Sequence, residues 1–488
     1  MLLYLLVVSS VRGTRSSSIE MRRATLMAIF FEYSHREYRP VVGDSTRRRV
    51  VLPIIVTDQG VLHQLVRYLY LRQRKSHTWK DSCVFAVQLL LDYVAVNHGA
   101  YKRPKDLFTE FANALYTGTI QDHRDASGLY WEPRQNDARW IIWHITQFTE
   151  WLSKVNDDAN LKLNPWREAT RHEQRLNWAA QSQHKDKAFL AHLFIDRGES
   201  NKSREVRSEY LPTENKAPAK AFPEEKRDEL LINGFRRSRR DGRGQIDLRN
   251  VLITILMHYG SLRLSEALSL WNDDVTVESG EVIVRIYHPE AGLAPDMKTS
   301  RAAYLQRRYG LEPRNRLVKA INPLYLGWKN PLITDPHRKC FEVTFFPTVA
   351  GEHFVRLWQD YHLMQRVKPR PGVEHPYAFT NKNGQPYTHR MFRKAHKLAI
   401  ERIGLISGKM LGTTPHGHRH AYGQRFAAAG ATKITIKTAM HHASISSSDV
   451  YTQPTSSDFR KSMVDLESKL SEKHFSTIFQ YLTSRDES

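Results

Sequence analysis

Residues 414–451 hold side chains whose types and spacing suit the binding of an anion. Thr414 and Pro415 predict a helix start, because threonine is a common N-cap and proline is favoured at the first helical position. His416 and Arg419 then lie three residues apart, on the same face of the first turns. The free N–H groups and positive dipole end of a helix start attract anions. The stretch therefore predicts an anion-binding site at this helix start.

The same stretch brings two further polar side chains toward that site. Gly430 predicts the end of the first helix, and a second short helix from about Thr432 leads to His442. A capped helix start at residues 446–449 follows, with Tyr451 just inside it. Two histidines, an arginine and a tyrosine around one anion-sized hole favour phosphate chemistry.

These residues resemble the C-terminal signature of the tyrosine recombinase (phage integrase) family. That signature is His-x-x-Arg, a His or Trp about twenty-three residues later and a Tyr nine residues after that; both spacings are met here. The family also has an earlier arginine in a Gly-x-Arg-x-Ser-Glu-like run, and GSLRLSEALSLWNDDV contains Arg263. The resemblance covers roughly residues 223–465. The matching signature positions are His416, Arg419, His442 and Tyr451.

The resemblance implies a role for each matched residue. Arg263 and Arg419 would bind the non-bridging oxygens of a phosphodiester and stabilise the pentacoordinate state, with a further hydrogen bond from His442. Tyr451 would be the nucleophile, forming a 3′-phosphotyrosyl link, and His416 would accept or relay its proton. No metal, nucleotide or other cofactor is expected, because the phosphotyrosine conserves the bond energy for rejoining.

A catalytic lysine is also implied, in the turn between two paired strands. GEVIVRIYHP and KCFEVTFFPT have strand-like spacing, but their connection, roughly residues 289–338, is longer than the family pattern. Lys298, Lys329 and Lys339 are the candidates for the general acid that protonates the departing 5′ oxygen. Lys329 is favoured, then Lys339, because glycine, tryptophan and proline around Lys329 indicate an anchored turn.

Two alternative interpretations concern the same residues. Arg263 could make an ordinary ion pair with Glu266, three residues on, but the downstream signature favours a catalytic Arg263 that Glu266 orients. A zinc site is disfavoured because Arg419 lies among the histidines and no cysteine is near. The histidines that invite the zinc interpretation are His416, His418, His420, His441 and His442.

The amino-acid composition indicates which class of molecule the protein binds and in which compartment it lies. The 488 residues include 73 Lys and Arg against 51 Asp and Glu, a formal charge of +22, which favours nucleic acid, here double-stranded DNA. Cys83 and Cys340 are the only cysteines, so no disulfide framework is expected and a reducing cytoplasm fits. The apolar start MLLYLLVVSSVRG is too short to span a bilayer. We expect a soluble, prokaryotic-type cytoplasmic protein associated with the nucleoid.

Helical periodicity predicts a mainly α fold with a small β-sheet, an α+β organisation. The expected parts are an N-terminal extension at 1–56, a helical DNA-clamp domain at 57–160, a linker at 161–222, the catalytic domain at 223–465 and a helical tail at 466–488. In the resembling family a helical core-binding domain occupies the second of these positions.

The expected function is that of a site-specific recombinase or integrase, which cuts and rejoins DNA for a mobile element. Family behaviour implies four protomers on two DNA sites, with or without accessory proteins. One alternative is a DNA relaxase with the related chemistry of type IB topoisomerases. Another is a non-catalytic DNA-binding protein that kept the fold.

Overall fold

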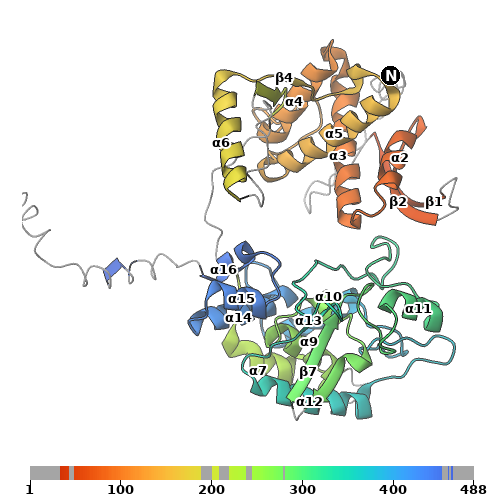
Figure 1. Cartoon of the computed structure of the whole chain (residues 1–488), viewed down its shortest axis with the longest axis vertical. Helices are drawn as coiled ribbons and strands as arrows, with labels where there is room; N and C mark the ends of the chain where they lie inside the picture. The colour runs from red at the N-terminus through yellow and green to blue at the C-terminus, as the bar shows by residue number, and fades with distance from the viewer. Residues whose placement is uncertain are drawn as a thin grey trace, which may run out of the picture. The chain divides into compact units, whose positions relative to one another are not determined.

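The computed structural model describes residues 33–42, 49–187, 201–207, 219–237, 245–278, 281–452, 460 and 463–464. The chain divides into two compact units, 1–213 and 214–488 (Figure 1). The described residues are mainly helical, with small antiparallel sheets, so the expected α+β class is confirmed. Among them no helix is long and apolar enough to cross a membrane. The expected tail at 466–488 and residues 1–32 lie outside the described residues.

The first unit is built on a helical core. Its main helices are α2 (His63–Leu71), α3 (His77–Asn97), α4 (Pro104–Thr117), α5 (Gln135–Asn156) and α6 (Arg171–Lys187). In α5, the periodic side chains of Ile141, Ile145 and Phe148 are all buried, as the helical spacing predicts. Burial of that apolar stripe against α3 and α4 holds the unit together.

Strands extend this unit beyond the helices expected from sequence. β1 (His35–Val42) pairs antiparallel with β2 (Arg49–Thr57), which pairs with β3 (Gly60–Val61). Leu52 and Ile55 of β2 are fully buried in a cluster shared with α2 and α3. Part of the range expected as an N-terminal extension is therefore packed into the first unit.

The range expected as a linker, 161–222, also contains folded segments. β4 (Trp166–Glu168) pairs with β5 (Lys202–Arg204), and Val206 is buried in the helical core of the first unit. At the other end of the range, Phe222 is buried in the core of the second unit.

The second unit combines helices with one three-stranded sheet. Its strands are β6 (Val275–Glu278), β7 (Glu281–Tyr287) and β8 (Cys340–Glu342), antiparallel in the order β6-β7-β8. The two strands expected around the long connection are β7 and β8. The helices are α7 (Arg227–Glu229), α9 (Leu248–His258), α10 (Leu264–Ala267), α11 (Arg301–Tyr309), α12 (Val349–Asp360), α13 (His389–Arg402), α14 (Pro415–Ala428), α15 (Lys433–Ala439) and α16 (Asp449–Thr452).

The long connection at 289–338 is anchored to this unit by buried arginines. Arg314 donates to three backbone carbonyls, those of Leu268, Leu324 and Tyr387, and is almost fully buried. Arg301, at the start of α11, forms a buried ion pair with Asp274. The connection is thus tied to the rest of the second unit through buried polar contacts.

Candidate active site

The first turn of α14 has no room for a side chain at position 417. Thr414 has extended backbone angles at the N-cap and Pro415 begins the helix, as predicted. A Cβ on Gly417 would lie 1.7 Å from the carbonyl oxygen of Gly412. The Gly417 carbonyl accepts a hydrogen bond from the backbone N–H of Phe222 at 3.0 Å. Glycine is therefore required at position 417, where the Gly412 carbonyl lies against the first turn of α14.

Arg419 and Arg263 come from different segments and face the same region. Arg419 is buried and donates to the backbone carbonyls of Ser261 and Met440. Arg263 donates from Nη1 to Glu266 Oε1 at 2.7 Å, and the Glu266 carboxylate also accepts the Arg263 backbone N–H at 2.7 Å. Burial and the nearby Arg263 charge lower the pKa of Arg419 to about 10. Guanidinium groups are the side chains best suited to bind the oxygens of a phosphate.

Tyr451 lies against α14 with its hydroxyl group on a histidine. The distance from Tyr451 Oη to His420 Nδ1 is 2.9 Å, and the Tyr451 ring stacks on that of His442 with 6.2 Å between centroids. A Cβ on Gly423 would lie 2.7 Å from the Tyr451 ring, so this glycine makes room for the tyrosine. His442 is held by a hydrogen bond of 3.1 Å between Nδ1 and Ser448 Oγ.

The protonation states follow from burial and the two arginines. Burial raises the pKa of Tyr451, although the charges of Arg419 and Arg263 oppose this rise. Burial and the Arg419 charge lower the pKa of His420, and they lower that of His442 to about 3. At neutral pH the phenol is therefore protonated and His420 is neutral. The phenolic O–H then donates to the lone pair of His420 Nδ1.

The sequence assigned the proton-accepting role to His416, yet the structure places His420 on the tyrosine hydroxyl. The two rings are neighbours on one helix face, with centroids 4.4 Å apart, and His416 is exposed at the helix start. The i, i+4 spacing of the two histidines was visible in the sequence. Which of them meets Tyr451 depends on the placement of α16, which the spacing does not specify.

The turn that carries Lys329 lies close to these residues. The pKa of His416 is lowered mainly by its partial removal from water. The charges of His420 and Arg419 on the same helix lower it further, and so does the charge of Lys329. Three residues beyond Lys329, the Leu332 backbone N–H donates to the His441 carbonyl at 3.0 Å. The Trp328 ring packs on that of His288, 5.4 Å between centroids, and so anchors the turn.

The other two candidate lysines occupy different turns. Lys298 is exposed in a turn whose N–H groups bond to Asp296 before α11 begins. Lys339 is exposed directly before β8, with its backbone carbonyl bound to the His288 N–H at 2.8 Å. Lys329 stays the favoured prediction because its charge acts on His416. Within the described residues no group of three or more His, Cys, Asp or Glu side chains is placed to hold a metal ion.

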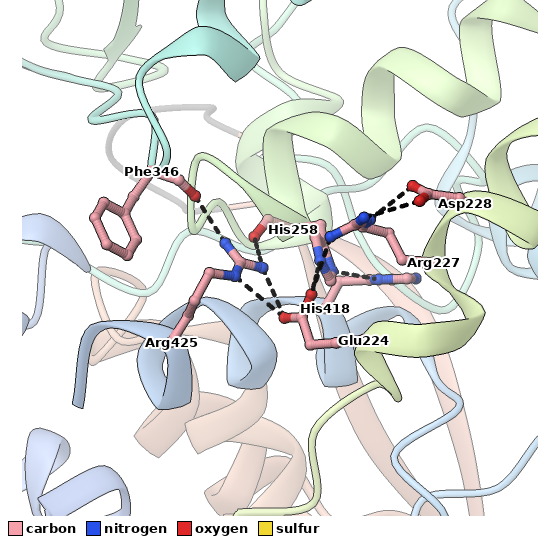
Figure 2. A network of polar contacts seen from close by, with 7 residues as sticks. All are labelled: Glu224, Arg227, Asp228, His258, Phe346, His418 and Arg425. Atoms are coloured by element: carbon pink, nitrogen blue, oxygen red, sulfur yellow. Dashed lines mark hydrogen bonds and ion pairs between the residues drawn. The ribbon is translucent and has the colours of Figure 1, made fainter. Parts of the chain in front are cut away.

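A chain of buried histidines supports α14 from its other face. His418 Nδ1 lies 3.2 Å from His258 Nδ1 on α9, and His418 Nε2 lies 2.9 Å from His396 Nε2 on α13. His258 Nε2 in turn lies 3.2 Å from the Glu224 carboxylate. Figure 2 shows Glu224 between His258 and Arg425, whose Nη2 is 2.9 Å from the other carboxylate oxygen.

Glu224 fixes the direction of every hydrogen bond in this chain. A carboxylate only accepts, so His258 must carry its proton on Nε2 and leave Nδ1 as an acceptor. His418 must then donate from Nδ1 and accept at Nε2, which makes His396 the donor from its Nε2. The one nitrogen left over, His396 Nδ1, is a buried acceptor without a partner. Three neutral imidazoles therefore lock α14 to α9 and α13.

Comparison with known proteins gives the family of part of this unit. Residues 353–457 match the family model described as the phage integrase family. They therefore form a domain of that family, the tyrosine recombinases. The matched range includes His416, Arg419, His442 and Tyr451, whereas Arg263 and Lys329 precede it.

Solved structures of recombinases also align with the chain. The XerH site-specific recombinase bound to its difH substrate is 14% identical, over 82% of this chain and 83% of that one, with a TM-score of 0.44. The Tn1549 transposon integrase in complex with transposon right-end DNA is 13% identical, over 83% and 98%, with a TM-score of 0.40. No curated protein sequence matches the chain.

Proposed function

We propose that this chain is a site-specific recombinase that cuts and rejoins double-stranded DNA through Tyr451. The observation that carries the proposal is the Tyr451 hydroxyl, held on a neutral histidine 2.9 Å away and within the field of Arg263 and Arg419. A nucleophile, a proton acceptor and two cations for the phosphate oxygens are the parts that phosphoryl transfer to a hydroxyl group requires.

The proposed reaction balances without any group beyond the protein and DNA. Tyr451 Oη attacks the scissile phosphorus, its proton moves to His420 Nδ1, and the bond from phosphorus to the 5′ oxygen breaks. The departing oxygen takes a proton from Lys329 Nζ and leaves as a 5′ hydroxyl. Arg263 and Arg419 bind the non-bridging oxygens, and His442 donates a further hydrogen bond. Reversal by a 5′ hydroxyl of a second strand gives exchange.

Arg419 is oriented before DNA binds in this proposal. Without DNA its guanidinium donates to the Ser261 and Met440 carbonyls, which fixes its plane and leaves other N–H groups for a phosphate. Arg263 is likewise fixed by Glu266 on one side. Side chains that are oriented before the substrate binds lose little entropy when charge develops on it.

Several further parts of the proposal rest on family behaviour. Four protomers would assemble on two DNA sites, and the first unit would clamp the DNA with its helices. The reaction would serve a mobile element. The net charge of +22 supports a DNA partner, because phosphate neutralisation releases counterions and drives binding.

Trapping of a covalent adduct tests the proposal. A pool of nicked random-sequence duplexes should give a denaturant-resistant 3′-linked adduct with the wild type, since the short product beyond the nick diffuses away. Tyr451→Phe should give none while DNA affinity stays within about twofold, because only the nucleophilic oxygen is lost.

Tyr422→Phe is the matched control, because Tyr422 is a buried tyrosine of α14, the helix against which Tyr451 lies, and its hydroxyl donates to the Thr344 carbonyl at 2.8 Å. It should form the adduct. An adduct of normal yield with Tyr451→Phe would place the nucleophile elsewhere. Strand exchange between two copies of a captured site would indicate a recombinase, and relaxation of supercoiled plasmid without exchange would indicate a relaxase.

A further inference from the structure

The turn that ends α15 has the geometry of a Schellman motif with an unusual residue in it. The His441 N–H donates to the Thr438 carbonyl at 3.0 Å, and the His442 N–H donates to the Lys437 carbonyl at 2.9 Å. His441 takes the left-handed position, with φ of +52°. Glycine is the residue that occupies this position without strain, so a histidine here is disfavoured by its backbone.

Three consecutive carbonyls of this turn each hold a different segment of the site. The hydrogen bonds are Ser261 Oγ to Ala439 O at 3.0 Å, Arg419 Nη2 to Met440 O at 2.5 Å, and Leu332 N to His441 O at 3.0 Å. The first segment leads directly into Arg263, and the third contains Lys329. One turn therefore gathers both arginines and the favoured lysine, and its next residue is His442.

The His441 side chain adds a contact that glycine would lack. Its ring is 3% exposed and stacks on Phe341, with 3.9 Å between centroids and 29° between planes. Both of its ring nitrogens are buried without a hydrogen-bond partner. Because one nitrogen of a neutral imidazole carries a hydrogen, a donor is left unsatisfied. The residue is thus unfavourable both in its backbone and in its polar group, which points to a role beyond packing.

We propose that His441 is a positioning residue that sets the place of Lys329 by holding both ends of the segment 332–341. Its carbonyl binds Leu332 at one end, and its ring stacks on Phe341 of β8 at the other. Without the ring, the contact with Phe341 would be lost and only the backbone hydrogen bond to Leu332 would remain. The link from His441 to catalysis rests on the proposed function, in which Lys329 protonates the leaving 5′ oxygen.

His441→Gly separates this role from a purely structural one. Glycine accepts the positive φ and keeps the carbonyl, so His442 and the fold are retained while the ring is removed. Hydrogen exchange of the peptide that contains Leu332, in the full chain without DNA, should become at least tenfold faster at that amide. Cleavage of an ordinary duplex should slow about tenfold. A duplex with sulfur in place of the bridging 5′ oxygen should be cleaved within twofold of the wild-type rate, because a thiolate leaves without a proton.

His362→Ala is the matched control. His362 is a partly buried histidine that packs on Trp358 at 4.6 Å and also has a ring nitrogen without a partner, but it lies on the short helix after α12. It should change neither measurement. Unchanged Leu332 exchange in His441→Gly overturns the proposal, as does equal slowing on both duplexes. If the wild type cleaves neither duplex, the proposed function fails, and the exchange measurement still decides whether His441 holds the segment.

Discussion

Replacing His396 by glutamine should make the second unit less sensitive to acid. His396 is 1% exposed, and burial lowers the pKa of its imidazole from 6.5 to about 3. As the pH falls below 6.5, His396 therefore binds a proton in the unfolded chain but stays neutral in the folded chain. Protonation of His396 therefore costs the folded state no stability above pH 6.5. Between pH 6.5 and 3 the free energy of unfolding falls progressively.

The magnitude follows from the width of that interval. A proton that binds only to the unfolded chain lowers the free energy of unfolding by about 1.4 kcal/mol per pH unit. His396 alone therefore lowers the free energy of unfolding by about 2 kcal/mol at pH 5. His258 and His418 are equally buried, and burial lowers the pKa of both. Protonation of these two histidines in the unfolded chain adds to that loss, against a total stability of about 5–15 kcal/mol for a typical domain.

Glutamine can keep the hydrogen bond and remove the titration. Its side-chain N–H₂ can donate to His418 Nε2 as His396 Nε2 does, but it binds no proton in this range. Hydrogen exchange of α14 amides, corrected for the intrinsic effect of pH, should show a loss of stability toward pH 5 that is smaller by about 2 kcal/mol than in the wild type.

His396→Leu serves as the control for this substitution. It also removes the titration, but it leaves His418 Nε2 without a donor and should lower the stability by about 1–3 kcal/mol at every pH. Identical pH slopes for His396→Gln and the wild type would refute the reasoning, since His396 would then not be held neutral.

Two further predictions concern proton transfer in the proposed reaction. Lys329→Ala should cleave an ordinary duplex at least about tenfold more slowly than the wild type and the 5′-sulfur duplex at near the wild-type rate. If the 5′-sulfur duplex restores the rate of Lys339→Ala but not that of Lys329→Ala, Lys339 is the general acid. His420→Ala should slow cleavage about 10²-fold, because its neutral Nδ1 accepts the phenolic proton. Since the pKa of His420 is lowered, wild-type cleavage should rise with pH below 6.5 and level off near neutrality, and His420→Ala should lack that rise.

Local patterns in the sequence predicted the elements that carry the site. The threonine and proline before α14, the alternating residues of β7 and the Arg263–Glu266 pair all depend on neighbours within a few residues, and the structure contains each of them. Such short-range signals decide where an element begins and which face is apolar.

These local patterns could not predict contacts between segments that are far apart in the sequence. His258 and His418 are 160 residues apart, and nothing in their local sequence pairs them. The anchoring of the insert by Arg314 depends on carbonyls from three segments, and the contact of His420 with Tyr451 depends on how α16 packs. The pairing of β1 with β2 in the range assigned to an extension likewise joins two separate segments, and the packing of β2 on α2 and α3 depends on residues further along the chain.

The contact of Phe222 with α14 sets a limit on how the two halves of this chain can be exchanged. Its ring stacks on His418 at 4.4 Å, and the Ala219 carbonyl accepts a hydrogen bond from Gln424 at 2.7 Å. A gene fusion that joined a new N-terminal half at residue 223, the domain boundary expected from the sequence, would place foreign side chains against the helix of His416 and Arg419. Exchange between relatives should therefore succeed when the junction precedes Ala219, so that the short segment 219–224 is inherited together with the helix it covers.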